Sequence, residues 1–324
     1  MLSGLFKNSS FGAKLVISIF VILISMLLFT ILGILISIPV FGLNLTSLMD
    51  SMGTPDSSNI AFMKLFQSAI SLGMFVVPPF IIAWLLKGEV TSFLFINNKP
   101  YPFSILLVAV IMVLAIPFIN FLAEWNAKLS LPGFLAGLEQ FMKNAEQEAE
   151  KLTMLFLKAE GIGTLTVNLI VIAIIPAVGE ELLFRGVFQK LFTDWTKNAH
   201  IGIWVAAFLF SAIHFQFYGF LPRMIMGAFF GYLLFWSKNM WLPIAAHFAN
   251  NAFAVITYYL MNKSVIGDSA ETMGTGNGSF TTALVSFVLV ASLTYILIRY
   301  QKEKDAGQVQ VFAEESQNNN QLPS

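Results

Sequence analysis

Residues 164–185 read TLTVNLIVIAIIPAVGEELLFR, an apolar run that contains two adjacent glutamates and ends on an arginine. A run of roughly 20 apolar residues is long enough to cross the ~30 Å hydrocarbon core of a bilayer as a helix. Ionisable side chains inside such a helix are costly to bury without partners, so they mark candidate functional sites. This stretch therefore predicts both a membrane span and a polar site within it.

The composition extends this prediction to the whole chain. Of 324 residues, 57% are hydrophobic and 11% are charged, against roughly 25% charged in an ordinary soluble domain. Apolar runs of similar length recur along the sequence and exclude a single soluble domain. We expect an all-α, polytopic bundle of about eight membrane-spanning helices. The expected spans are 15–41, 60–86, 103–124, 164–184, 201–217, 219–236, 240–261 and 279–299.

Charge and cysteine content exclude several classes of function. Lys and Arg total 18, as do Asp and Glu, so no net charge favours a nucleic acid partner, and none is expected. Cysteine is absent, which excludes disulfides, thiolate zinc sites and a cysteine nucleophile. The first apolar run is far longer than the core of a signal peptide, and we expect it to be a retained helix.

The charges of the loops predict the orientation in the membrane. Cytoplasmic loops carry an excess of Lys and Arg. Basic residues precede the first span and follow every even-numbered span, whereas the loop 42–59 has none. We therefore expect both termini in the cytoplasm. The loop 125–160 fits less well, because its four lysines are opposed by five glutamates.

Two segments differ from the spans. Between Phe134 and Leu152, apolar residues recur at helical spacing and are separated by Gln, Glu and Lys. We expect an amphipathic helix over about 132–158 that lies on the membrane surface or packs outside the membrane. The tail 305–324 is polar and rich in Gln and Asn, and we expect it to be disordered.

Helical geometry gives the two glutamates different roles. Neighbouring side chains on a helix diverge by about 100°, so Glu180 and Glu181 cannot both point at one spot. Glu181 stands four residues before Arg185, the favoured spacing for an ion pair within a helix. We expect a structural Glu181–Arg185 pair. Glu180 is then free to face the interior, where a desolvated carboxyl group suits general acid–base catalysis.

Polar residues on later spans complete the candidate site. His247 and Asn251 stand at i and i+4 and share one helix face, which offers two donors to a developing oxyanion. His214, on another helix, would hold a water molecule against Glu180. Counting the rise per residue from the expected span ends places Glu180 roughly 6 Å deep, His247 roughly 10 Å and His214 roughly 20 Å. We attribute this mismatch to the boundary of the fifth span.

Other polar or small residues have plainer interpretations. Arg223, near a span end, is expected to reach a lipid headgroup. His200 is expected in a solvated loop, and Asn250 is expected to be incidental. Gly227 and Gly231 form a small-xxx-small pair that predicts close helix packing.

Three segments resemble motifs of the CPBP family: Glu180-Glu181-Leu-Leu-Phe-Arg185 resembles EExxxR, Phe210-Ser-Ala-Ile-His214 resembles FxxxH, and His247-Phe-Ala-Asn-Asn251 resembles HxxxN. That family contains CAAX prenyl endopeptidases and bacterial relatives named for abortive infection or bacteriocin self-immunity. The resemblance implies that Glu180 is the catalytic base and that His214 helps to position water. It implies an oxyanion site at His247 and Asn251. Glu181 and Arg185 remain the structural pair.

The resemblance extends over roughly residues 164–261, less than a third of the chain. It divides the sequence into five expected regions. These are a three-span region 1–125, the amphipathic segment 126–160, a CPBP-type catalytic core 161–262, a loop with the last span 263–304, and the tail 305–324.

The implied reaction is peptide hydrolysis near the cytoplasmic membrane face, with no covalent intermediate. The expected partners are a peptide or prenylated protein substrate and the lipid bilayer, in a bacterial cytoplasmic membrane. The family has been described both as a metalloprotease and as a metal-free glutamate protease, so the cofactor is either none or a divalent metal such as zinc. With a metal, Glu180, His214 and His247 would resemble a two-His, one-Glu ligand set.

Two other functions fit part of the pattern. A non-catalytic immunity or binding protein would use the same polar pocket, and it would keep its function after Glu180→Gln or His214→Ala. A proton-coupled transporter would relay protons through buried carboxylates and histidines. Against the transporter, no paired, broken-helix symmetry relates the two halves of the sequence.

Overall fold

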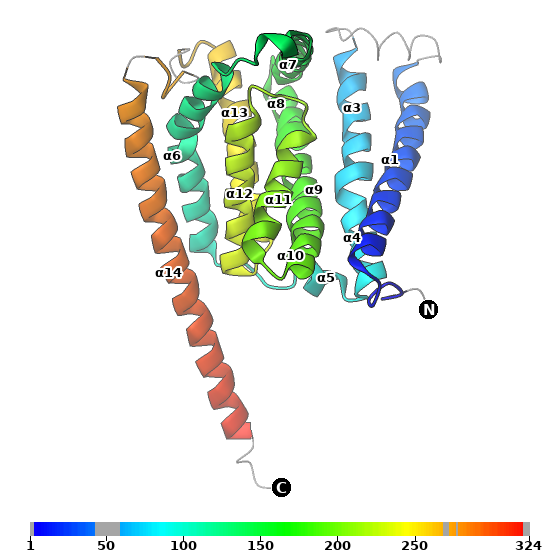
Figure 1. The fold of residues 1–324 in the computed structure, drawn as a ribbon, viewed down its shortest axis with the longest axis vertical. Coiled ribbons are helices and arrows are strands. Elements are labelled where there is room, and N and C mark those ends of the chain that lie inside the picture. The colour runs from blue at the N-terminus through cyan, green and yellow to red at the C-terminus, as the bar shows by residue number, and fades with distance from the viewer. Residues whose placement is uncertain (1–2, 43–58, 268–271, 277, 320–324) are drawn as a thin grey trace.

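The computed structural model describes residues 3–42, 59–267, 272–276 and 278–319, and every element in these ranges is helical. The helices stand side by side in a bundle (Figure 1). In chain order the elements are α1 (Phe11–Phe41), α3 (Ile60–Ser71), η1 (Leu72–Val76), α4 (Val77–Leu86), α5 (Val90–Phe93), α6 (Pro102–Ala127), η2 (Gly133–Leu135), α7 (Ala136–Leu157), α8 (Ile162–Asn168), η3 (Leu169–Ile174), α9 (Ile175–Glu181), η4 (Leu182–Gln189), α10 (Lys190–Thr196), α11 (Ala199–Ala212), α12 (Phe220–Ser237), α13 (Trp241–Asn262) and α14 (Ser279–Asn319). Most of the predicted loop 42–59 lies outside the described residues.

Six helices in the described ranges are long and apolar enough to cross a membrane. They are Phe11–Phe41, Ile60–Leu86, Pro102–Ala127, Ile162–Thr196, Phe220–Ser237 and Ser279–Lys304. This confirms the all-α fold and identifies six of the expected spans as candidate membrane spans. The expected fifth span is the shorter helix α11, which ends at Ala212, and the seventh is α13, whose His and Asn side chains lower its hydropathy.

The fourth span is longer than expected. The sequence places its end at 184 because Arg185 and Gln189 interrupt the apolar run, but the helix continues to Thr196. Both polar side chains are buried and donate to backbone carbonyls of α12: Arg185 Nη2 lies 2.9 Å from the Gly227 oxygen and Gln189 Nε2 lies 3.1 Å from the Gly231 oxygen. These hydrogen bonds offset the free-energy cost of burying the two polar side chains, so the helix can continue past them.

This boundary changes the depth of Glu180. The residue lies near the middle of Ile162–Thr196 rather than close to its end, so the span end from which its depth was counted was misplaced. The boundary of the fifth span also differs from expectation, because α11 ends at Ala212, before His214. The expectation of hydrolysis near the cytoplasmic face was based on the same count from the span end.

The bundle has two distinct ends (Figure 1). The termini end consists of residues 3–14, 84–101, 190–200, 237–241 and 299–304, which contact one another. For example, the Gly4 N–H donates to the Trp84 carbonyl and the Met240 N–H donates to the Phe95 carbonyl. The rings of Phe11 and Trp195 are stacked.

The α7 end lies opposite and consists of the described parts of 124–163, 213–220 and 260–279. Asn126 Nδ2 donates to the Phe217 carbonyl, and Lys263 Nζ donates to the Glu160 carbonyl. Figure 1 shows α7 lying across this end of the bundle. The helix expected at 132–158 is thus present as η2 and α7.

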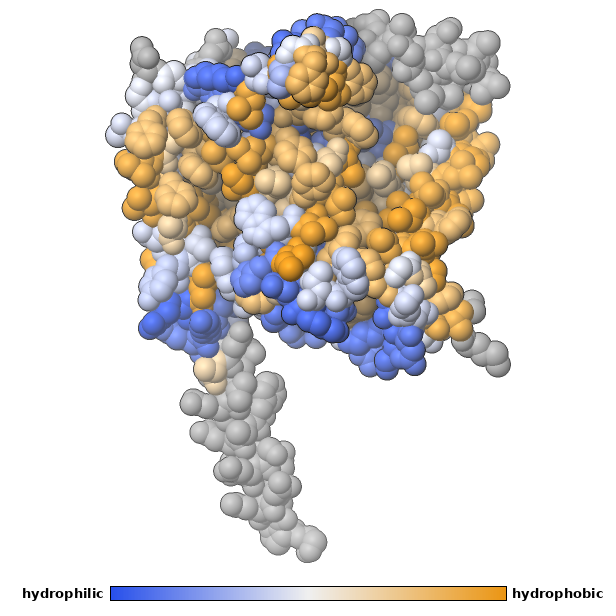
Figure 2. Space-filling model, in the orientation of Figure 1, coloured by the Kyte–Doolittle hydropathy of each residue, from blue (hydrophilic) through white to orange (hydrophobic). Residues whose placement is uncertain are grey.

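An apolar belt separates the two ends. Figure 2 shows hydrophobic side chains around the middle of the molecule and hydrophilic ones at both ends. Large apolar side chains on α1, α6 and α14 are among the most exposed, including Phe20 at 60%, Leu106 at 63% and Phe280 at 65%. Apolar surface of this extent fits contact with lipid.

The C-terminal helix differs from expectation. α14 continues to Asn319, through most of the tail 305–324 that the sequence analysis expects to be disordered. Gln, Glu, Lys and Ala are good helix formers, and residues 320–324 lie outside the described ranges.

Two glycines allow α12 to lie close to η4. A Cβ atom at Gly227 would lie 3.0 Å from Phe210 Cδ1 and 3.1 Å from Arg185 Nη2. At Gly231 it would lie 2.7 Å from Gln189 Oε1 and 2.9 Å from Ile203 Cγ2. The predicted close packing of this pair is confirmed, and it brings the glycine carbonyls within reach of the buried side chains.

We predict that Gly231→Ala destabilises the protein, because the added methyl group overlaps neighbours that are fully packed, at a cost of ~1–3 kcal/mol. The measurement is the midpoint of thermal unfolding in detergent. Gly137→Ala on α7 is the matched control, since a Cβ atom there meets nothing within 4 Å. Equal midpoints for the two variants would contradict the packing argument.

Candidate active site

The site is built on a buried ion pair. Arg185 Nη1 donates to Glu181 Oε1 at 3.0 Å, and the two side chains are 1% and 0% exposed. The guanidinium also lies 4.5 Å from the centre of the Phe210 ring and 5.4 Å from that of Phe230. The pair predicted from the i, i+4 spacing is therefore present, and it is enclosed by aromatic side chains.

His247 connects this pair to Glu180. Its Nδ1 donates to Glu181 Oε1 at 2.8 Å, and its Nε2 lies 3.9 Å from Glu180 Oε2. The ring stacks on Phe230 with centres 5.3 Å apart. Because the carboxylate of Glu181 accepts from Nδ1, the ring presents Nε2 to Glu180. The contact between Glu181 and His247 is not among those predicted from the sequence.

His214 lies just beyond the end of α11, in a turn. Its Nδ1 donates to the Phe210 carbonyl at 2.7 Å. A carbonyl only accepts, so Nδ1 carries the proton and Nε2 is the free nitrogen. The FxxxH spacing positions the ring in this way, because the histidine returns to the carbonyl four residues earlier.

Asn251 is held by the backbone of the helix that carries Glu180. Its Nδ2 donates to the Ile172 carbonyl at 3.1 Å. Pro176 stands four residues after Ile172 and has no N–H with which to bond that carbonyl. The π-helical segment η3 precedes this proline, and such segments are frequent at functional sites. Asn250 Nδ2 in turn donates to Asn251 Oδ1 at 3.1 Å.

One cavity of about 470 Å³ brings these residues together. The four residues predicted to be catalytic all line it, although no single helix carries more than two of them. Its lining comprises Gln67, Leu152, Thr153, Phe156, Val171, Ile172, Pro176, Glu180, Phe210, His214, Arg223, Met226, His247, Asn250 and Asn251. Glu180 and His247 are both buried.

Comparison with known proteins identifies this region. Residues 162–253 match the family model described as type II CAAX prenyl endopeptidase Rce1-like. The chain contains an Rce1-like domain of the CPBP family. The uncharacterized protein YpbD of Bacillus subtilis is 32% identical over 89 residues, which are 26% of this chain and 42% of that protein. The match thus spans less than half of the length of that relative. No solved structure matches the chain significantly.

The Rce1-like domain contains all four predicted catalytic residues, but it does not enclose the cavity alone. Gln67 comes from α3, and Leu152, Thr153 and Phe156 come from α7. The N-terminal spans and the amphipathic helix therefore complete the site that the domain begins.

Three side chains outside the motifs belong to the site or its surroundings. Arg223 lines the cavity and donates to Gln216 Oε1 at 2.7 Å, rather than reaching a headgroup as expected. Lys64 is buried in α3, and its Nζ donates to Asn168 Oδ1 at 2.5 Å. Asn250, which was expected to be incidental, contacts Asn251 and lines the cavity. In the sequence, the signal that could have identified Lys64 is a charged residue within an apolar run.

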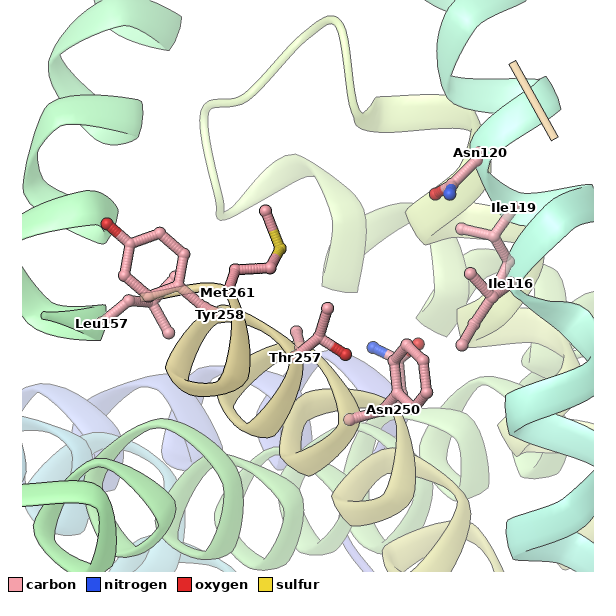
Figure 3. Close-up of a pocket in the computed structure, with 10 residues that line it drawn as sticks. Ile116, Ile119, Asn120, Leu157, Asn250, Thr257, Tyr258 and Met261 are labelled. Carbon is pink, nitrogen blue, oxygen red and sulfur yellow. The ribbon is translucent and has the colours of Figure 1, made fainter. Parts of the chain in front are cut away.

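Figure 3 shows a second cavity, with a volume of about 190 Å³. It is mostly apolar and lies between α6, the end of α7 and α13, with Ile116, Leu157 and Met261 among its lining. Asn250 lines both cavities. The two cavities therefore meet at Asn250, and most of the lining of the second lies outside residues 162–253.

The proposed metal ligands do not form a set in this arrangement. Within the part of the chain that the structure describes, no three His, Cys, Asp or Glu side chains are grouped so as to hold a metal ion. Glu180, His214 and His247 thus do not fit a shared metal here. His200, the third histidine, is a surface residue whose Nδ1 lies 2.9 Å from the Tyr232 hydroxyl.

We predict that the two glutamates differ in their effect on stability. Glu181→Gln leaves the buried Arg185 without its counter-charge, which costs ~3–5 kcal/mol for a buried pair. Glu180→Gln replaces a carboxyl group by an amide of similar size, and its nearest ionisable partner is 3.9 Å away, so the protein should be as stable as before. Thermal unfolding of both variants in detergent tests this. Equal losses would show that Glu180 is also a structural residue.

Proposed function

We propose that the chain is a membrane-embedded endopeptidase that hydrolyses peptide bonds with Glu180 as the base. The carrying observation is a buried carboxylate that faces His247 Nε2 at 3.9 Å on the wall of a cavity large enough for water and a peptide segment. The Rce1-like domain supports a peptide or protein substrate. The catalytic core is the region 161–262.

The reaction needs one water molecule. Glu180 takes a proton from that water, and His214 Nε2 orients it by hydrogen bonding. The water oxygen then attacks the scissile carbonyl carbon, and the carbonyl oxygen becomes an oxyanion. When the intermediate collapses, the C–N bond breaks and Glu180 passes its proton to the leaving nitrogen. The products are a carboxylic acid and an amine, between which one proton then redistributes, and no covalent enzyme intermediate forms.

His247 and Asn251 are the proposed oxyanion donors. Glu181 accepts from Nδ1 of His247 and stabilises the ring when Nε2 is also protonated. Asn251 uses one Nδ2 hydrogen on the Ile172 carbonyl and has a second one for the substrate oxygen. Both donors would be pre-oriented by the protein before the substrate arrives.

The substrate is proposed to be a membrane-associated polypeptide, with CAAX-type or related processing as the reaction class. The apolar cavity beside Asn250 would accept an apolar part of that substrate. We place the protein in a bacterial cytoplasmic membrane with both termini in the cytoplasm, in keeping with the basic loops at the termini end.

We predict that Glu180→Gln lowers cleavage by at least about 100-fold, since a positioned base contributes typically 10²–10⁴-fold. The measurement is cleavage of a peptide and prenyl-peptide library by purified protein in liposomes, followed by mass spectrometry. Glu148→Gln, at an exposed position on α7, is the matched control and should retain full activity.

His214→Ala should also lower cleavage while leaving thermal unfolding unchanged. Undiminished cleavage by Glu180→Gln would refute the mechanism. A cellular phenotype that survives both substitutions would favour the non-catalytic binding protein.

A further inference from the structure

The two ends of the bundle carry opposite charge balances. Among the described residues, the termini end has ten basic and three acidic side chains, whereas the α7 end has five and six. At the termini end these are Lys7, Lys14, Lys87, Lys99, Lys190, Lys197, Lys238, Arg299, Lys302 and Lys304 against Glu89, Asp194 and Glu303. At the α7 end they are Lys128, Lys143, Lys151, Lys158 and Lys263 against Glu124, Glu139, Glu146, Glu148, Glu150 and Glu160. Such an asymmetry orients a membrane protein with its basic end in the cytoplasm.

The catalytic cavity extends from Glu180 towards the α7 end. Its walls include Ile172 and Pro176, which precede Glu180 on a helix that begins at the α7 end, and Leu152 and Thr153 of α7 itself. Thr153 is exposed, so the cavity reaches the surface beside α7.

On the other side of Glu180 the bundle is closed. Leu183, Phe184, Arg185 and Val187 are each at most 2% exposed. A separate pocket at the termini end reaches Arg185 and Gln189, but Glu180 is not among its lining residues. Arg185 therefore forms part of a seal between that pocket and the catalytic cavity.

The α7 helix is fastened along its length at the mouth of this cavity. Glu146 Oε2 accepts from the Tyr218 N–H at 3.2 Å, close to His214 in the chain. Near its C-terminus, the Leu157 carbonyl accepts from Asn168 Nδ2 at 3.0 Å, and Asn168 is held by Lys64. Hydrogen bonds from Lys143 and from the backbone N–H of Leu131 hold the pKa of Glu139 below its usual range.

The outer apolar face of this segment is exposed. Phe134 is 85% exposed, Leu138 47% and Phe141 57%. These residues follow helical spacing, and an amphipathic helix of this kind lies at the boundary between headgroups and acyl chains. The mouth of the cavity therefore opens at the membrane interface of the α7 end.

We infer that the site takes its substrate from the side of the membrane opposite the basic termini end, so that its substrates are polypeptide segments exposed on the non-cytoplasmic face. This rests on the proposed function for the reaction itself. The side of the membrane on which the site opens follows from the charge asymmetry and the cavity alone. The α7 helix forms one wall of the entrance.

The chain contains no cysteine, so single cysteines report the position of each end. Glu148→Cys on α7 and Glu303→Cys on α14 form a matched pair, because both glutamate side chains are 71% exposed and lie at opposite ends. A membrane-impermeant maleimide added to intact spheroplasts should label Glu148→Cys and not Glu303→Cys. In inside-out vesicles the pattern should reverse. The opposite pattern, or labelling of both from one side, would overturn the inference, whether or not the protein cleaves peptides.

Access to the cavity is tested with Thr153→Cys, which lies on its wall. A bulky impermeant maleimide added to spheroplasts should lower cleavage of a peptide supplied outside by at least tenfold relative to the same variant without reagent. Glu148→Cys, labelled in the same way on the same helix, should be unaffected. Full cleavage by labelled Thr153→Cys would overturn the entrance beside α7. No cleavage by any unlabelled variant would instead count against the proposed function, and the labelling result would still stand.

Discussion

The carboxylate of Glu181 is the contact on which the rest of the site depends. Its Oε1 atom accepts from Arg185 on the next helical turn and from His247 on α13, while Arg185 reaches the Gly227 carbonyl on α12. Three helices are thus joined through one oxygen atom and one guanidinium. In apolar surroundings neither charge is tolerable alone, so the helices must meet with these partners in register. This register fixes the orientation of the His247 ring, so that its Nε2 faces Glu180.

The backbone around the glutamates is adapted to the same end. The helix α9 that carries Glu180 is flanked by the π-helical segments η3 and η4. Pro176 has no N–H that could donate a hydrogen bond to the Ile172 carbonyl. Asn251 uses that carbonyl as its anchor. Local departures from α-helix therefore provide the acceptor that holds a proposed catalytic amide. Gly227 and Gly231 serve a similar purpose on α12, where the lack of a side chain exposes carbonyls to Arg185 and Gln189.

Much of this arrangement follows from local rules, which explains what the sequence could and could not predict. Apolar length predicted six of the spans, and i, i+4 spacing predicted the Glu181–Arg185 pair, because both depend on residues close in the chain. The contact of Glu181 with His247 spans 66 positions, and no periodicity specifies it. The end of the fourth span was misplaced for the same reason. A hydropathy scale scores Arg185 as a polar interruption and takes no account of the Gly227 carbonyl that accepts its hydrogen bond. Lys64 was missed, and Arg223 was assigned to a lipid headgroup, because their partners lie on other elements.

An ionisable site within a helix bundle also needs access to water. The cavity provides a route, because its lining includes Glu180 and His247 as well as Leu152 and Thr153 of α7. In the other direction, Phe184 and Val187 close the bundle, and Arg185 is itself part of that barrier. The ion pair that orients the histidine therefore also lies between the catalytic cavity and the pocket at the termini end. A single buried pair can have both effects because its two side chains are 1% and 0% exposed and fill the space between the helices. Sealing and orientation are then consequences of the same contacts, and a substitution that breaks the pair would be expected to disturb both together.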